Sequence, residues 1–368
     1  TTTQVNFGMN FAAFKNRLNI DVEVYQKRSK DQYFQNLSLP STTGFTKADV
    51  NSGSMENKGF ELSVNTVPYR SKAWNISFNI NLARNINSIL DVPDQYPMQK
   101  GVLTTNGQYV RRFELGQPIG AIYGFRYKGV YLNDDQTIAR DANGNKIYSY
   151  DASGKRTPVQ MRFAYPTIDY QFKAGDAIYE DINHDGNIDY QDVVYLGNAN
   201  PILTGGFGPN IRYKSVSVSA FFNFRYGNKV INKMGMSLQN MASYNNQSKA
   251  VLRRWRHPYE DEATAPTDLL PRAVYGSKNA YNYLGSDRFV EDGSFLRFKT
   301  LTVKYTFDKK QLKNTFLQSC QIWTTLSNLY VWTNYSGMDP EIALTGGAFK
   351  MGEDNSRIPV SYTHLRAH

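Results

Sequence analysis

Hydrophobic and polar residues alternate along most of the chain with a period of two. The run from Val5 to Phe11 has this pattern, and it returns from Leu18 to Val24 after a short turn. Because successive side chains of a β-strand point to opposite faces, such runs predict strands with one apolar and one polar face. Further runs lie at residues 60–64, 74–82, 216–226 and 301–307, and weaker ones at 119–131, 207–213 and 321–332. The pattern predicts an all-β fold of about nine or ten strands.

The connections between these runs come in two sizes. Short turns are expected at 67–72 and 214–215, and long polar connections at 26–57, 132–200 and 228–294, the last with local helical turns within 236–256. Loops this long are uncommon in a compact soluble domain. A transmembrane barrel alternates short periplasmic turns with long extracellular loops, and several runs reach the roughly 9–11 residues that a tilted membrane strand needs. We therefore predict an antiparallel transmembrane β-barrel, since the strands of a β-sandwich are shorter, typically about 5–6 residues.

The composition narrows the class of protein further. Aromatic residues reach 14% although mean hydropathy is −0.54, which fits strands that are apolar on one face only. The chain has no apolar run of about 20 residues, so a helical membrane protein is excluded. Cys320 is the only cysteine, which excludes a disulfide scaffold. The net charge is +10, but the cations are scattered, so we predict no nucleic-acid partner.

Catalytic motifs are absent from the sequence. It contains no nucleophile elbow, no phosphate-binding loop, no dinucleotide fingerprint and no H-E-x-x-H zinc motif. None of the histidines has the neighbours that catalysis requires; they are His184, His257, His364 and His368. We predict no catalytic residue and no enzymatic activity.

One aspartate-rich segment, residues 181–192, has the spacing of a calcium-binding loop. Oxygen-bearing side chains occupy loop positions 1, 3 and 5, a glycine occupies position 6, and a carboxylate occupies position 12. The predicted ligands are Asp181, Asn183, Asp185, Asn187 through its carbonyl, Asp189 through water, and Asp192. Position 12 is usually Glu, whereas here it is the shorter Asp192. The ion, Ca²⁺, would be structural and would fix the long connection before Pro201; the alternative is an exposed Asp/Asn/Gly turn without metal.

Four segments, in this order, are similar to a known family. The segment Asn334–Ile342, with the sequence NYSGMDPEI, resembles the C-terminal signature of SusC/RagA-type TonB-linked outer-membrane proteins. Residues 43–62, 175–207 and 287–297 are similar to the same family. The resemblance extends over most of residues 1–360.

The resemblance implies a barrel that imports bulky nutrients, oligosaccharides or peptides, across a Gram-negative, Bacteroidetes-like outer membrane. It also implies a SusD-like lipoprotein at the extracellular mouth, contact with outer-membrane lipid, and energy from the TonB complex through an N-terminal part. Such transporters have about 22 strands. Residues 1–360 are therefore expected to be the C-terminal portion of the barrel. Residues 361–368 resemble no family strand and are expected to be a non-native tail.

The main alternative is a secreted, calcium-stabilised β-sandwich that binds glycans or acts as an adhesin. A sandwich would place Phe7, Val22, Phe78 and Phe222 in a dry interior between two layers, whereas a barrel would turn them toward lipid. The substrate-binding residues are not identified by the sequence. Loop tyrosines that could stack on sugars include Tyr259, Tyr275, Tyr281 and Tyr283.

Overall fold

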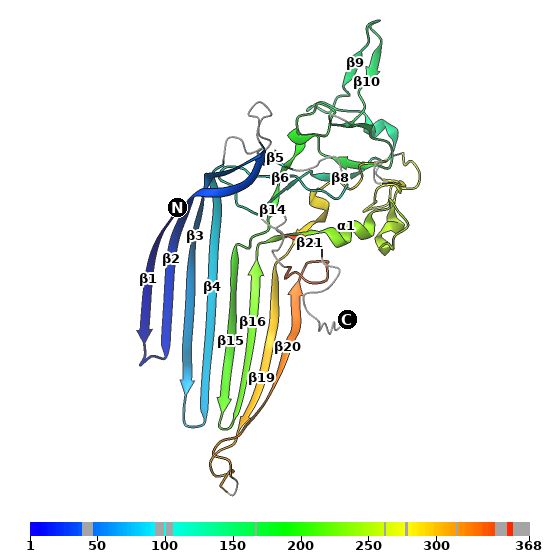
Figure 1. Cartoon of the computed structure of the whole chain (residues 1–368). Coiled ribbons are helices and arrows are strands. Elements are labelled where there is room, and N and C mark those ends of the chain that lie inside the picture. Colours follow the sequence, from blue (N-terminus) through cyan, green and yellow to red (C-terminus); the bar gives the residue numbers. More distant parts are fainter. Residues whose placement is uncertain are drawn as a thin grey trace.

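The structure is a computed structural model of the chain, and it describes residues 1–38, 47–92, 99–100, 106–165, 168–260, 263–276, 279–313, 316–342 and 352–355. Two regions are evident: a large sheet of long strands, and a group of smaller elements at one end of it (Figure 1). We call the second region the cap; it comprises the described parts of residues 92–202, 227–294 and 334–355.

The large sheet contains eight strands among the described residues, and each pairs antiparallel with its neighbours. In spatial order they are β1 (Thr2–Ala13), β2 (Leu18–Ser38), β3 (Lys47–Arg70), β4 (Trp74–Asp91), β15 (Leu203–Tyr213), β16 (Val216–Tyr226), β19 (Phe295–Thr306) and β20 (Gln321–Thr333). Spatial order follows chain order, interrupted only by the two cap insertions after β4 and β16. The prediction of an antiparallel all-β architecture is confirmed.

The register places the apolar positions of neighbouring strands side by side. Phe7 lies opposite Val24, and Val22 opposite Leu62. Farther along the sheet, Phe207 stacks on Phe222, and Phe222 on Phe298, with ring centroids 4.9 and 4.5 Å apart. A shift of one residue in any pair would move its apolar set to the other face. One continuous apolar face therefore extends across the sheet.

This apolar face is not covered by a second layer in the described residues. Phe7 is 71% exposed, and Val22, Phe78 and Phe222 are only partly buried. A sandwich would bury such positions between two sheets. The β-sandwich alternative is therefore not supported by the fold.

Turns and strand lengths differ in part from the prediction. The turn at Phe14–Arg17 is confirmed, with left-handed backbone at three of its residues, and so is the turn at Lys214–Ser215. The expected loop at 26–57 is wrong, because β2 and β3 continue through most of it, as the pair Gln32–Ser52 shows. Backbone ladder bonds form whatever the side chains are, so polar residues can extend a hairpin beyond an apolar band.

The segment 119–131 is not a strand of the large sheet. It forms β7 (Ala121–Gly124) and β8 (Tyr127–Val130) in the cap, where they pair with β14 (Val194–Asn198) and β13 (Ala177–Tyr179). Its side chains Tyr123, Phe125 and Tyr131 are buried in one cap core, and Ile122 is buried in the other. This is why the sheet has fewer strands than predicted.

The cap is folded rather than a set of open loops. Its remaining strands are β5 (Gln99–Lys100), β6 (Arg111–Arg112), β9 (Tyr148–Tyr150), β10 (Arg156–Pro158), β11 (Arg162–Tyr165), β12 (Ile168–Gln171), β17 (Lys229–Asn232), β18 (Val290–Asp292) and β21 (Glu353–Asp354). Its helical turns are α1 (Lys233–Gln239), η2 (Asp134–Thr137), η3 (Tyr190–Asp192), η4 (Lys249–Arg253) and η5 (Asp287–Phe289). The helical turns predicted within 236–256 are present. None of the helices in the described ranges has the length and hydropathy to cross a bilayer.

Both insertions contribute to each of the cap's two larger cores. Phe163 of the first packs on Tyr281 of the second, with ring centroids 4.6 Å apart. The buried carboxylate of Asp176 accepts a hydrogen bond from Arg272 Nε at 2.7 Å and another from the Tyr170 hydroxyl at 2.6 Å. The long polar connections predicted at 132–200 and 228–294 thus form one packed body, because their aromatic residues are numerous enough to build a core.

Candidate functional site

The polar face of the large sheet carries amide, hydroxyl and charged side chains. Carboxylates gather on β2 and β3, where Glu23 lies directly opposite Glu61. Cations lie farther along the sheet, at Arg212 on β15 and Lys304 on β19. A barrel made from this sheet would have an inner wall with separated acidic and basic areas.

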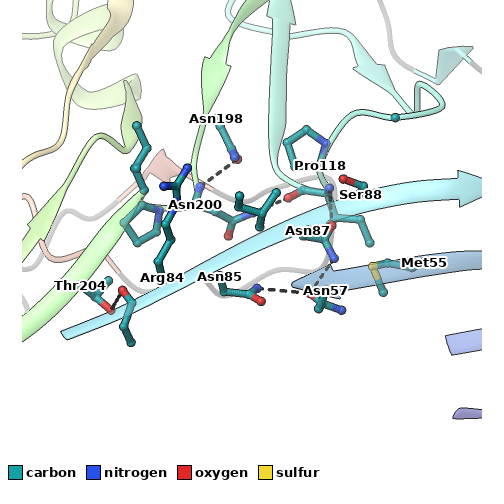
Figure 2. A pocket seen from close by; sticks show the side chains of 16 residues that line it. Met55, Asn57, Arg84, Asn85, Asn87, Ser88, Pro118, Asn198, Asn200 and Thr204 are labelled. Carbon is teal, nitrogen blue, oxygen red and sulfur yellow. Dashed lines mark hydrogen bonds between the residues drawn. The ribbon is translucent and has the colours of Figure 1, made fainter. Parts of the chain in front are cut away.

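A pocket of about 500 Å³ lies where the sheet meets the cap (Figure 2). It forms because β4 continues past the point where its neighbour β15 begins, so the cap segments 116–119 and 198–202 complete the wall. Its lining mixes apolar side chains, among them Met55, Ile86 and Ile202, with Arg84 and five side-chain amides. The amides belong to Asn57, Asn85, Asn87, Asn198 and Asn200.

Hydrogen bonds between these amides and the backbone of Ile119 join the two regions. Asn57 Oδ1 accepts bonds from the side-chain amides of Asn85 at 3.2 Å and Asn87 at 2.9 Å. Asn87 Oδ1 in turn accepts the backbone N–H of Ile119 at 2.9 Å, and the Asn200 side chain donates to the Ile119 carbonyl. Both backbone groups of one cap residue are therefore held by asparagines from opposite sides of the pocket.

The pocket combines amide groups with apolar side chains and one cation, Arg84 (Figure 2). Amide groups both donate and accept hydrogen bonds, so they can bind hydroxyl or peptide groups without favouring either charge. Sequence reasoning did not identify this pocket, because its asparagines are far apart in the chain. The one sequence feature that pointed to the pocket was the segment Gly197–Pro201, because it lies within a segment that resembles the family.

The predicted calcium loop lies between β13 and β14 and is wrapped around its first aspartate. Asp181 Oδ2 accepts the N–H of Gly186 at 2.8 Å, and the φ angles of His184 and Gly186 are 57° and 82°. Asp185 Oδ1 accepts the N–H of Asn187 at 2.8 Å, and Asn183 donates to Asp185 Oδ2 at 2.9 Å. Ile188 is fully buried in the cap core. The sequence spacing thus produces a compact, anchored turn.

The last two aspartates of the loop have structural partners. Asp189 caps η3, and the buried Asp192 accepts the N–H groups of Ile182 at 2.8 Å and Asp189 at 2.9 Å. Burial, together with the charges of Asp181 and Asp189, raises the pKa of Asp192 to about 6. In the described part of the chain, which includes the whole loop, no three His, Cys, Asp or Glu side chains converge as a metal-holding group. The donors are oxygens, which suit Ca²⁺, but the Asp192 oxygens are engaged with the backbone.

Relatives with known names align with nearly the whole chain. TonB-dependent receptor P39 of Formosa agariphila is 28% identical over 375 residues, which cover 97% of this chain and 34% of that protein. TonB-dependent receptor SusC of Bacteroides thetaiotaomicron is 24% identical over 99% of this chain and 31% of its own length. The chain is a homologue of TonB-dependent receptors. It spans about a third of the length of these relatives. No protein-family model matches it.

Solved structures show the same fold. The RagAB peptide transporter superposes with a TM-score of 0.62 at 23% identity, covering 92% of this chain and 32% of that chain. The RagAB peptide importer in its open-open state gives a TM-score of 0.65 at 21% identity, with 96% and 32% covered. The SusC/RagA-type barrel fold expected from the sequence resemblance is confirmed, and this sheet corresponds to part of such a barrel.

Proposed function

We propose that the protein imports bulky nutrients, oligosaccharides or peptides, across the outer membrane of a Gram-negative, Bacteroidetes-like bacterium. The observation that carries this proposal is the homology to TonB-dependent receptors over 93–99% of the chain. The exposed apolar face of the large sheet supports it, because such a face is stable in lipid and unfavourable in water.

The relatives are named for their dependence on TonB, and we extend that dependence to this protein. We propose no catalytic role. Uptake of a fluorescently labelled oligosaccharide or peptide pool by cells carrying the full-length protein is the direct test. We expect uptake to stop when the gene or TonB is deleted, while uptake of a monosaccharide continues through other channels. Equal uptake of the bulky pool with and without the gene would contradict import.

A SusD-like lipoprotein is the proposed partner at the cap side of the sheet. The family resemblance implies such a partner, and the cap offers a folded surface for it. Purification of the tagged full-length protein in mild detergent should recover a lipoprotein in constant ratio to it. A preparation of intact, transport-competent protein without a lipoprotein would contradict this part of the proposal.

We further propose that the loop 181–192 binds structural Ca²⁺. Asp181, Asn183 and Asp185 would supply side-chain oxygens, Asn187 its carbonyl and Asp189 a water-mediated contact, with Asp192 as the sixth predicted ligand. The wrapped backbone and the oxygen donors support this proposal. The convergence of carboxylates that calcium would favour is not present in the structure, and Asp192 would need to give up backbone bonds to bind directly.

Isothermal titration calorimetry with CaCl₂ tests the calcium proposal. The wild-type protein should release binding heat, and Asp181→Ala should remove it. Asp141→Ala is the matched control, because Asp141 accepts the backbone N–H groups of Asn143 and Asn145 in an exposed turn. That turn has Lys146 in place of the glycine at position 6 and Ala152 in place of the carboxylate at position 12. No heat in the wild type, or equal heat in Asp181→Ala, would refute the site.

A further inference from the structure

Two exposed tyrosines of the cap lie side by side. Tyr244 is 93% exposed and Tyr275 is 68% exposed, and their ring centroids are 5.4 Å apart. The segments that carry them are joined by a 2.9 Å hydrogen bond from the Gly276 N–H to the Ala242 carbonyl. The pair is therefore held together by backbone contacts rather than by chance proximity of two free side chains.

Other tyrosines singled out in the sequence have different surroundings. Tyr281 and Tyr283 are buried in the two cap cores, and Tyr259 packs beside His257. Of these four, Tyr275 is the one whose side chain is exposed, and Tyr259 is half-buried. Tyr244, which the sequence did not suggest, provides the second ring.

The segment that carries Tyr244 is polar and uncharged from Asn240 to Ser248, and the exposed Lys249 follows it. Residues 243–247, with the sequence SYNNQ, are all exposed, and so is Asn279. Between Asn240 and Ser248 the chain has no charged residue and, at its exposed positions, no aliphatic one. Protein-binding hot spots instead combine aromatic residues with arginine and surrounding apolar contacts. A highly charged ligand would find no counter-charge in this segment.

We propose that Tyr244 and Tyr275 form a stacking platform for neutral carbohydrate. The C–H groups on one face of a sugar ring are apolar and carry slight positive charge, so they pack on the electron-rich face of a tyrosine. The amides of Asn245, Asn246 and Gln247 follow Tyr244 in the chain and can donate to and accept from sugar hydroxyl groups. This inference rests on the proposed import function and favours carbohydrate over peptide as its cargo.

Binding of a printed array of neutral oligosaccharides by the detergent-solubilised full-length protein tests the platform. We expect Tyr244→Ala and Tyr275→Ala each to weaken binding of the best wild-type ligand by about 3- to 10-fold. Tyr244→Phe should bind nearly as well as the wild type, because it keeps the ring. Tyr150→Ala is the matched control, since Tyr150 is also 68% exposed but lies on β9, in the hairpin that projects from the cap (Figure 1).

Any of three results would overturn the platform: the wild type binds no neutral oligosaccharide, Tyr244→Ala and Tyr275→Ala bind as well as the wild type, or Tyr150→Ala loses as much binding as they do. Loss of a co-purified lipoprotein in Tyr244→Ala, with glycan binding unchanged, would identify a protein interface instead. Uptake is measured separately: tyrosine-dependent binding without uptake would refute import alone, and uptake with tyrosine-independent binding would refute the platform alone.

Discussion

The large sheet and the cap solve the problem of burying apolar side chains in opposite ways. The sheet is one layer thick, and its apolar face is exposed in the isolated chain. The cap buries aromatic rings in its own cores and pairs its buried charge, as at Asp176 and Arg272. A lipid-facing sheet obtains its apolar surroundings from the membrane, whereas a water-exposed region must supply them itself.

This difference explains how one chain can combine a regular and an irregular half. In the sheet, an apolar residue reaches the apolar face if it stands at an alternate position of its strand and the strand pairs in the correct register. In the cap, an apolar residue is buried only if a specific partner from a distant segment packs against it. The cap should therefore be sensitive to loss of single contacts, and the sheet to a charge on the wrong face.

The largest expected effect is in the cap. Asp176→Ala removes the partner of the Arg272 guanidinium and of the Tyr170 hydroxyl, both partly buried. We expect the cap to lose about 3–5 kcal/mol of stability, because removing the buried half of this ion pair leaves the partly buried Arg272 guanidinium without its partner. Proteolysis of the folded protein in detergent should cleave the cap first and leave the large sheet protected.

The matched control for that variant is Asp268→Ala. It breaks the exposed ion pair with Arg253, whose atoms are 3.3 Å apart, and should cost less than about 1 kcal/mol. Protease resistance of Asp176→Ala equal to that of Asp268→Ala would contradict a cap held by its buried ion pair.

The sheet should respond most to a charge on its apolar face. Phe222→Lys places an ammonium group between Phe207 and Phe298, and should destabilise the protein by about 2–4 kcal/mol in lipid vesicles. Urea unfolding followed by tryptophan fluorescence measures this. Asn81→Lys, at an exposed position on the opposite face, should have little effect. Equal losses in the two variants would mean that the apolar face does not contact lipid.

A smaller effect is expected at the junction of the two regions. Asn87→Ala leaves the Ile119 N–H without its acceptor, at a cost of about 1–2 kcal/mol. Asn85→Ala is the control, because Asn85 bonds to Asn57 and Tyr25 within the sheet. Hydrogen exchange measured by mass spectrometry should rise in the peptide containing Ile119 in the first variant only. Unchanged exchange in Asn87→Ala would show that this asparagine does not couple the cap to the sheet.

The smallest effect concerns the hairpin of β9 and β10. The hydroxyl of Ser153 and nearby backbone N–H groups lower the pKa of Asp151. Because the pKa of Asp151 is lower in the folded than in the unfolded protein, its ionised carboxylate stabilises the turn at pH values above the unfolded-state pKa. This stabilisation is lost as the pH falls through the folded-state pKa. A nitroxide at Thr157→Cys, in a Cys320→Ser background, should become more mobile in acid. Asp151→Asn should remove that pH dependence. The same pH dependence of nitroxide mobility with and without Asp151→Asn would contradict the prediction.

Much of the sheet could be predicted from the sequence because its signal is local. The alternation from Val5 to Phe11 and the turn at Lys214–Ser215 need no knowledge of distant residues. The extension of β2 and β3 was missed because its residues are mostly polar and do not alternate with apolar ones. Their backbone groups still pair across the two strands. The calcium loop was found because its donors are contiguous in the chain; whether it binds Ca²⁺ stays a prediction. The expected tail at 361–368 lies outside the described residues.

The sequence by itself determined the strand parity, the apolar face and the wrapped loop at 181–192, because each depends on residues a few positions apart. Only the tertiary structure decided that two long polar connections form one cap, that asparagines from distant segments meet around Ile119, and that Tyr244 lies beside Tyr275. Those contacts join residues 30 to 96 positions apart, and their formation depends on how the whole chain closes rather than on any local pattern.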